Sequence, residues 1–271
     1  MTPVDLHHGA ASDVGLVRTV NEDSFLVAPP VFVVADGMGG HSGGDVASRM
    51  VVEEFGRLVA SFDPARGPQQ VAETLSRAQA RIVEYGDAHR VRTPGWHAGT
   101  TAVVAALVDD GGETKWLLAN LGDSRIYRIT EGRLEQVSVD HSVVQELIDA
   151  GHITPEQAAV HPERHVITRA LGSPGGIDPD FFLLPLGAVE RLLLCSDGVT
   201  GMIEDKEIED ILETVADPRD AADRLVRAAV EAGGRDNATA VVVDVVGLVK
   251  DARYDSQRQL QSLEDKLGGR V

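Results

Sequence analysis

Four aspartates of this sequence stand where an apolar, strand-like run begins or ends. Asp36 follows VFVVA, Asp197 follows LLLCS, Asp236 stands just before ATAVVV, and Asp123 lies between two such runs in LLANLGDSRIY. Each aspartate taken alone is typical of a turn or a cap. Four of them at the ends of rigid strands instead predict a site for a hard divalent cation, Mg²⁺ or Mn²⁺, because such ions prefer oxygen ligands. No cysteines or paired histidines at zinc spacing compete with this interpretation.

The stretch VFVVADGMGGHSGGDVAS, residues 31–48, carries the first of these aspartates. Its apolar, mostly β-branched start predicts a strand covered on both faces. Asp36 then leaves the core, where a carboxylate is costly unless a cation or a substrate meets it. Three glycines permit a tight turn and the approach of a ligand to main-chain oxygens: Gly37, Gly39 and Gly40. A helix is expected from about Asp45. The alternative is an ordinary loop in which Asp36 only caps a turn.

Composition limits the class of protein. With 271 residues, of which 43% are hydrophobic, one globular domain is favoured. The formal net charge of -18 argues against nucleic acid or anionic membrane as the partner. Cys195 is the one cysteine, stands inside LLLC and is expected to be a core thiol in a reducing compartment. Without a basic, apolar leader or a run of roughly 18 apolar residues, the chain is expected to be soluble and cytoplasmic, with no membrane span.

Strands and helices are expected in blocks. The strand-like runs are residues 31–36, 100–108, 115–121, 124–129, 190–195 and 238–246. Helical spacing occupies residues 45–61, 69–89, 203–214 and 219–232. Several runs are joined by short turns, which favours antiparallel neighbours and an α+β fold.

Two segments differ from this pattern. Residues 141–180, here called the flap segment, are rich in His, Pro and Gly and read as an irregular insertion that covers a site. From about residue 250 the chain is polar, with Leu260, Leu263 and Leu267 at helical spacing. Too few heptads exist for a coiled coil, so a loosely docked helix is expected there.

Six motifs, in order, resemble the metal-dependent protein serine/threonine phosphatases of the protein phosphatase 2C family in their bacterial form. They are SDVGLVRTVNEDS, VADGMGGHSGGDVAS, GTTAVVA, ANLGDSRIYR, LLLCSDGVT and RDNATAVVV, and they cover about residues 8–246. The resemblance implies a four-layer sandwich in which helices flank two central antiparallel sheets, with the metal centre at one end and the flap beside it. It implies a catalytic domain over residues 1–247 and a polar tail over 248–271. Two positions depart from the family pattern: Ala98 replaces a usual Met, and Met38 stands where eukaryotic members often carry a histidine.

The resemblance also implies a centre with two Mn²⁺ or Mg²⁺ ions and sometimes a third. Asp36 would bridge both ions, and the Gly37 carbonyl would ligate one of them. Asp197 and Asp236 would hold the other. Two such cations roughly 3.5 to 4 Å apart lower the pKa of a shared water and leave a bridging hydroxide for in-line attack on the phosphorus of phosphoserine or phosphothreonine.

The remaining roles surround this centre. By the same resemblance, Glu22 and Asp23 would act through metal-bound waters, and Asp123 would help to hold a weaker third ion. Arg18 would bind the phosphate of the substrate. A planar guanidinium matches phosphate oxygens, which favours this role over that of a plain surface charge.

The histidines and tryptophans are assigned less sharply. If a histidine protonates the leaving oxygen, the role passes from Met38 to His41, which otherwise is a solvated loop residue. His161 in the flap segment is placed between substrate binding and a structural role. Three further residues are expected to serve packing: Trp96, His97 and Trp116.

The expected partners are phosphorylated proteins, including a serine/threonine kinase. One alternative is a phosphatase of the same fold specialised on one small phosphorylated regulator, such as an anti-sigma-factor antagonist. The other is an inactive binding module that kept the fold and lost the metals. The joint presence of Asp36, Asp197 and Asp236 argues against the inactive module, because a dead site has no reason to keep uncompensated acids together.

Overall fold

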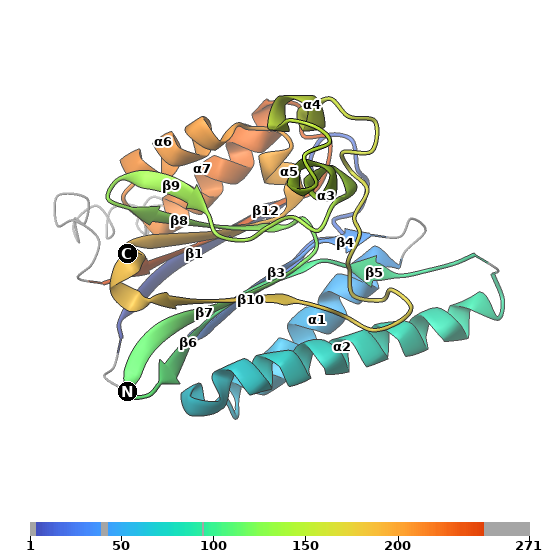
Figure 1. Cartoon of the computed structure of the whole chain (residues 1–271), viewed down its shortest axis with the longest axis horizontal. Coiled ribbons are helices and arrows are strands. Elements are labelled where there is room, and N and C mark those ends of the chain that lie inside the picture. Colours follow the sequence, from blue (N-terminus) through green and yellow to red (C-terminus); the bar gives the residue numbers. More distant parts are fainter. Residues whose placement is uncertain (1–3, 39–42, 94, 247–271) are drawn as a thin grey trace, which may run out of the picture.

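The computed structural model of this chain describes residues 4–38, 43–93 and 95–246. Its centre is a pair of five-stranded antiparallel sheets (Figure 1). The first sheet has the order β1 (Leu6–Asp13), β12 (Ala238–Val245), β11 (Arg191–Cys195), β8 (Arg125–Thr130) and β9 (Arg133–Gln136). The second has the order β10 (Asp180–Pro185), β7 (Glu113–Leu121), β6 (Ala102–Asp110), β3 (Val31–Ala35) and β2 (Ser24–Ala28). A short ribbon pairs β4 (Gly37–Met38) with β5 (Gly99–Thr100).

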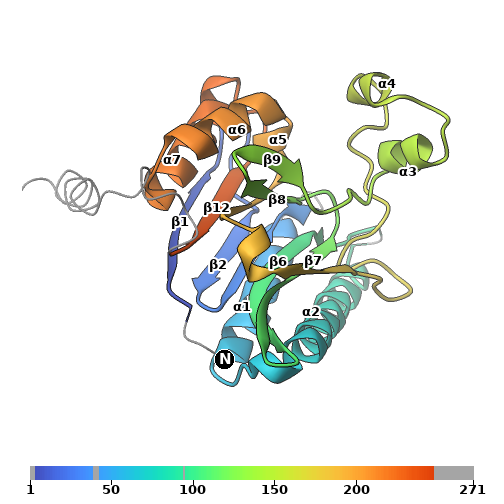
Figure 2. The ribbon, with the colours of Figure 1, turned by 60° about the vertical axis from the view of Figure 1, so that its left-hand side comes forward.

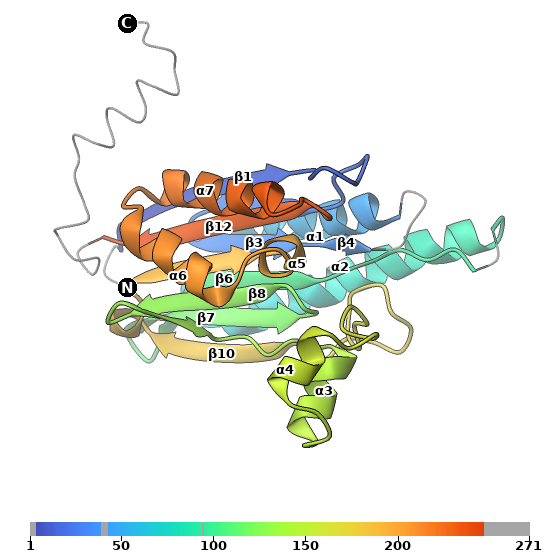
Figure 3. The same ribbon diagram turned by 90° about the horizontal axis from the view of Figure 1, so that it is seen from above.

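Helices cover the outer face of each sheet. The first sheet is covered by α5 (Asp197–Thr200), α6 (Asp205–Thr214) and α7 (Pro218–Glu231), and the second by α1 (Gly44–Val59) and α2 (Gly67–Arg90). Figure 3 shows the same layers from above. The α+β four-layer sandwich expected from the sequence is therefore confirmed. No helix in the described part of the chain combines the length and the apolar character needed to cross a membrane.

The core between the sheets explains why β3 reads as a continuous apolar run. Phe32 and Val34 point into the layer between the two sheets, whereas Val31 and Val33 pack under α1 and α2. All four side chains are fully buried, so the expectation of a strand covered on both faces is confirmed. Trp116 of β7 is also fully buried, with its ring centroid 6.3 Å from that of Phe32. Each such side chain contributes about 1.5–3 kcal/mol through burial alone.

Connecting pieces complete the chain between these layers. Two short 3-10 helices lie at η1 (Pro64–Arg66) and η2 (Leu186–Ala188). The flap segment holds α3 (Val143–Asp149) and α4 (Pro155–Ala159) and ends where β10 begins. Ser142 and Thr154 cap these two helices through their side-chain hydroxyls. Figure 2 shows α3 and α4 standing away from the sandwich. Several sequence expectations lie outside the described residues: Gly39, Gly40, His41 and the tail with its three leucines.

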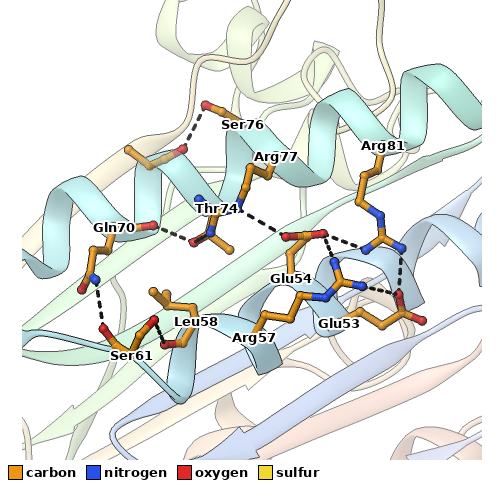
Figure 4. A network of polar contacts seen from close by, with 11 residues as sticks. Glu53, Glu54, Arg57, Leu58, Ser61, Gln70, Thr74, Ser76, Arg77 and Arg81 are labelled. Carbon is orange, nitrogen blue, oxygen red and sulfur yellow. Dashed lines mark hydrogen bonds and ion pairs between the residues drawn. The ribbon is translucent and has the colours of Figure 1, made fainter.

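A buried carboxylate ties α1 to α2 (Figure 4). Glu54 of α1 is only 3% exposed and accepts hydrogen bonds from Arg81 Nη1 at 2.8 Å and Arg77 Nε at 3.4 Å, both on α2. Arg57, one turn along α1, completes the ring of guanidinium groups. The neighbouring Glu53 binds Arg81 Nη2 at 2.8 Å.

Candidate functional site: an acidic centre at the end of the sandwich

The acidic residues gather where strands of both sheets end. Asp36 directly follows β3 and Asp23 directly precedes β2, so both belong to the second sheet. Asp197 is the first residue of α5, just after β11, and Asp236 stands just before β12, so both belong to the first sheet. Asp123 lies in the connection by which the chain passes from β7 in one sheet to β8 in the other. The strand-end positions predicted for the aspartates are thus observed, and the fold brings these positions together.

These buried acids act on one another electrostatically. Burial raises the pKa of Asp36 well above its usual range, and the charges of Asp23, Asp197 and Asp123 raise it further. Burial, followed by the charge of Asp236, also raises the pKa of Asp197. Burial, followed by the charges of Asp197 and Asp140, raises the pKa of Asp123 to about 7. An acid cluster that retains protons near neutral pH is one that a divalent cation stabilises.

Two of the clustered aspartates each have one buried carboxylate oxygen without a protein partner. Asp23 is held through Oδ2, which accepts hydrogen bonds from Ser196 Oγ and Thr239 Oγ1, each at 2.7 Å. Its other oxygen, Oδ1, is buried and accepts no hydrogen bond, and the same is true of Asp123 Oδ1. Burial raises the pKa of Asp23 to about 6. Rigid, desolvated oxygens without partners fit a hard cation, which would supply the missing interaction.

The acidic side chains lie at the same end of the sandwich, but they are not arranged as a complete ligand shell. Among the described residues, no three His, Cys, Asp or Glu side chains already converge on one point. At the rim, Arg18 Nη2 donates a hydrogen bond to Asp236 Oδ2 at 2.6 Å. This hydrogen bond, with the charges of Asp236, Glu22 and Asp36, raises the pKa of Arg18. Arg18 therefore faces the acids, as the sequence suggested, but its partner is itself a candidate ligand.

The glycine after Asp36 serves close packing. A Cβ at Gly37 would lie 2.3 Å from the carbonyl oxygen of Gly44 and 2.5 Å from that of Glu22. The backbone of Gly37 is not left-handed, so the predicted tight turn is not the reason for glycine at this position. Absence of a side chain lets Gly37 N–H donate to Glu22 O at 3.2 Å and joins the two acidic segments.

Asn237 is a residue that sequence reasoning missed. Its Nδ2 donates to the carbonyl oxygens of Val14 and Val20, both at 3.0 Å, and its Oδ1 accepts from Glu22 N–H at 2.8 Å. It therefore fixes the loop that carries Arg18. A buried Asn next to a candidate ligand in RDNATAVVV was the available signal, since a buried amide needs several partners.

The histidines and tryptophans fall into different environments. His161 makes local contacts in the turn after α4, where its N–H donates to Ala158 O and its Nδ1 accepts from Glu163 N–H. In the same segment the charge of His165 helps to lower the pKa of Asp197 against the larger opposing effect of burial. Packing is confirmed for Trp116, and Trp96 stacks on His89 at 4.5 Å.

The expectation that His97 serves packing is wrong. Its side chain is exposed, and its Nδ1 lies 3.2 Å from the carbonyl oxygen of Gly95 in its own turn. The aromatic neighbour Trp96 supplies the packing at this point instead, because only its ring reaches the cluster on α2.

Comparison with known proteins extends this description. The family model for protein phosphatase 2C matches residues 17–233. The chain is 34% identical over 248 residues to the serine/threonine phosphatase stp of Listeria welshimeri. This match covers 88% of this chain and 96% of that protein. Its fold is similar to the crystal structure of the serine/threonine phosphatase PstP/Ppp of Mycobacterium tuberculosis, with a TM-score of 0.79, 34% identity, and coverage of 90% and 99% of the two chains.

A second solved structure bears on the acidic centre. The catalytic domain of the serine/threonine protein phosphatase PstP, in complex with two manganese ions, superposes with a TM-score of 0.75 at 33% identity and covers 90% of this chain and all of that chain. The residues matched by the family model include Asp23, Asp36, Asp123 and Asp197, whereas Asp236 lies just beyond residue 233. With the family model over most of its length and a relative above 30% identity, this chain belongs to the protein phosphatase 2C family.

Proposed function

We propose that this chain is a metal-dependent protein phosphatase that hydrolyses phosphoserine and phosphothreonine in proteins. The observation that carries the proposal is the cluster of Asp36, Asp197, Asp23 and Asp123, drawn from both sheets, with mutually raised pKa values and two orphaned buried oxygens. Family membership and the manganese complex of a related catalytic domain support the same activity.

The acidic residues would hold two Mn²⁺ or Mg²⁺ ions, and a third more weakly. Asp36 would bridge the first two, and the charges of Asp23, Asp197 and Asp123, which all act on its carboxylate, support this central position. Three further ligands belong to the proposed set: Asp236, the Gly37 carbonyl and, through water, Glu22. When bound, the ions would activate a water for attack on phosphorus.

The protein supplies orientation and charge around that chemistry. Arg18 stands at the exposed rim, where its guanidinium can leave Asp236 and bind the phosphate oxygens of the substrate with a fork of N–H donors. Asp23 is kept rigid by Ser196 and Thr239, so its free oxygen keeps one direction. His161 stays a candidate substrate contact through its place in the flap segment.

The proposed substrates are phosphorylated proteins, including a serine/threonine kinase, in the cytoplasm. The stp protein and the PstP/Ppp structure named above are serine/threonine phosphatases, which supports this substrate class. The observations on the acidic centre favour neither the specialised phosphatase for one small regulator nor the inactive binding module.

The test is hydrolysis of a phosphothreonine peptide by the purified full chain, with Mn²⁺ and with EDTA. We expect phosphate release with Mn²⁺ and none with EDTA, because the attacking water needs bound ions to lower its pKa. Asp36→Asn should abolish both the activity and the tight binding of Mn²⁺. The matched control is Asp87→Asn, which removes an exposed carboxylate on α2 and should keep full activity. Full activity in EDTA would refute the proposed function.

A further inference from the structure

His141, the first residue of the flap segment, is buried against the glycine that precedes Asp123. Its side chain is only 4% exposed. The backbone N–H of His141 donates to Gly122 O at 3.0 Å, and its ring Nδ1 lies 3.2 Å from Gly122 N. One residue thus binds both the N–H and the carbonyl of Gly122.

These contacts define the tautomer of the ring. The backbone N–H of Gly122 can only donate, so Nδ1 of His141 must be unprotonated and accept. The ring proton is then on Nε2, which faces Asp180 Oδ2 at 3.2 Å. Arg169 Nη1 stands 3.4 Å from Asp180 Oδ1 and balances that carboxylate. The imidazole therefore connects the two ends of the flap segment, because His141 is its first residue and Asp180 is its last.

Gly122 needs such a link. Its φ is +116°, and a Cβ would lie 2.5 Å from Thr101 Cγ2, so only glycine fits at this position. A glycine in this conformation has little intrinsic preference to stay there, because it loses more conformational freedom on folding than any other residue. The direction of Asp123, the next residue, therefore depends on contacts made by its neighbours.

The other neighbour of Asp123 is anchored to the bridging aspartate. Ser124 Oγ and Thr101 Oγ1 are 2.7 Å apart, and Thr101 Oγ1 accepts a hydrogen bond from Asp36 N–H at 3.0 Å. Asp123 is thus held between two anchors, one leading to Asp36 and one leading to His141. Only the second connects it to the flap segment.

We propose that His141 is a positioning residue that fixes the carboxylate of Asp123 and couples it to the base of the flap segment. His141 acts through Gly122 and touches neither substrate nor ion. The proposal rests on the proposed function, in which Asp123 holds the weakest ion. It also implies that a shift of the flap segment moves Asp123, because Thr168 N–H of that segment donates to His141 O at 2.8 Å.

Two amide variants separate the ring contacts, because each replaces only one of the two ring nitrogens. His141→Asn keeps an acceptor near the Nδ1 position and loses the reach to Asp180, whereas His141→Gln extends toward Asp180 and loses the acceptor for Gly122. We expect His141→Gln and His141→Ala to lower kcat about 10- to 100-fold, as expected for a displaced catalytic group, and to leave KM for a small aryl phosphate unchanged. His141→Asn should restore most of the turnover.

A measurement that does not depend on activity tests the contact itself. Amide hydrogen exchange at Gly122, followed by NMR on the full chain, should be slow in the wild type and in His141→Asn and much faster in His141→Gln and His141→Ala. Equal exchange in all four proteins would overturn the proposal. This readout holds even if the chain proves to have no phosphatase activity, so the two failures are distinguishable.

A double-mutant cycle tests whether His141 acts through Asp123. In the Asp123→Asn background, the further change His141→Ala should lower kcat by less than twofold, because the group that it positions is already gone. Additive losses would overturn the positioning role and leave His141 as a purely structural residue. The rise in melting temperature caused by Mn²⁺ at the tight sites should be the same in wild type and His141→Gln, which shows that the fold and the central site are intact.

Discussion

The guanidinium of Arg18 and the carboxylate of Asp236 form an ion pair at 2.6 Å, so the residue proposed for phosphate and a residue proposed for metal hold one another. The Arg18 side chain is 53% exposed and that of Asp236 37% exposed. A pair this accessible to water contributes about 0–1 kcal/mol. Because the ion pair is weak, little free energy is lost when Asp236 binds an ion instead and Arg18 binds a phosphate instead.

Removing Arg18 should therefore strengthen the binding of Mn²⁺ and weaken the binding of a phosphopeptide. In Arg18→Ala, Mn²⁺ should bind up to about 5-fold more tightly, since Asp236 is freed and a nearby positive charge is lost. The KM for a phosphopeptide should rise about tenfold or more, because the guanidinium no longer binds the phosphate. Calorimetric Mn²⁺ titration and steady-state kinetics measure these effects. Arg18→Lys keeps the charge and should recover only part of the KM. Weaker Mn²⁺ binding in Arg18→Ala would contradict the exchange.

Binding of Mn²⁺ should release protons. The pKa of Asp36 is raised well above its usual range and that of Asp123 to about 7, so part of the cluster is protonated at pH 6.5 without metal. Metal ligands must be deprotonated, and the displaced protons pass to the buffer. Titration of Mn²⁺ by calorimetry in buffers of different ionisation enthalpy should give a heat that varies with the buffer, with a slope of about one proton. The same heat in every buffer would show that the acids are already ionised.

The metal-free protein should lose stability as the pH rises toward neutrality. Burial raises the pKa of Asp123 from 3.8 to about 7, so its protonated form is favoured in the folded state. That contribution is complete below pH 4 and is lost as the pH rises through 7. In EDTA, Asp123→Asn should therefore gain stability relative to the wild type between pH 5 and pH 8, by about 1–3 kcal/mol or roughly 2–10 °C in Tm.

The comparison of these two proteins at each pH isolates the contribution of Asp123, because other titrating groups are shared. A difference in Tm that is constant from pH 5 to pH 8 would mean that Asp123 titrates at its usual pKa.

The clamp between α1 and α2 should matter for stability. Glu54→Gln removes the charge that three arginines share, and we expect a loss of about 1–3 kcal/mol, which is reduced from the value for a fully buried pair because the arginines are partly exposed. Glu53→Gln, the matched control, changes an exposed neighbour and should cost less than about 1 kcal/mol. Urea unfolding followed by circular dichroism compares them. Equal losses of unfolding free energy in the two variants would show that the burial of Glu54 does not increase its contribution to stability.

Much of the architecture could be predicted from apolar runs. The runs around β3, β6, β7, β11 and β12 are strongly hydrophobic, and every one of them forms a strand. β1 was not predicted, because the sequence LHHGAASD has few apolar residues to alternate. It forms at the edge of its sheet through a full register with β12, from Leu6 opposite Val245 to Asp13 opposite Ala238. Tertiary pairing overrides weak local preference there.

The candidate site shows a similar division. Aspartates at strand ends are visible in the sequence because the charge interrupts an apolar run. Contacts such as those of Asn237 with Val14 and of His141 with Gly122 are not visible in this way, since they join segments 223 and 19 residues apart through backbone groups that every residue carries. His161 was singled out in the sequence and His165 was not, yet the fold brings the charge of His165 to bear on Asp197.

The origin of the acids in two different sheets has a consequence for how this protein can vary. Asp36 moves with the second sheet and Asp197 with the first, and the layer between them contains the contact of Phe32 with Trp116. Close-packed interiors transmit small displacements, so a change of side-chain volume in that layer slides one half of the centre past the other. Substitutions in this apolar layer are therefore expected to alter the relative position of Asp36 and Asp197 as well as the stability of the fold.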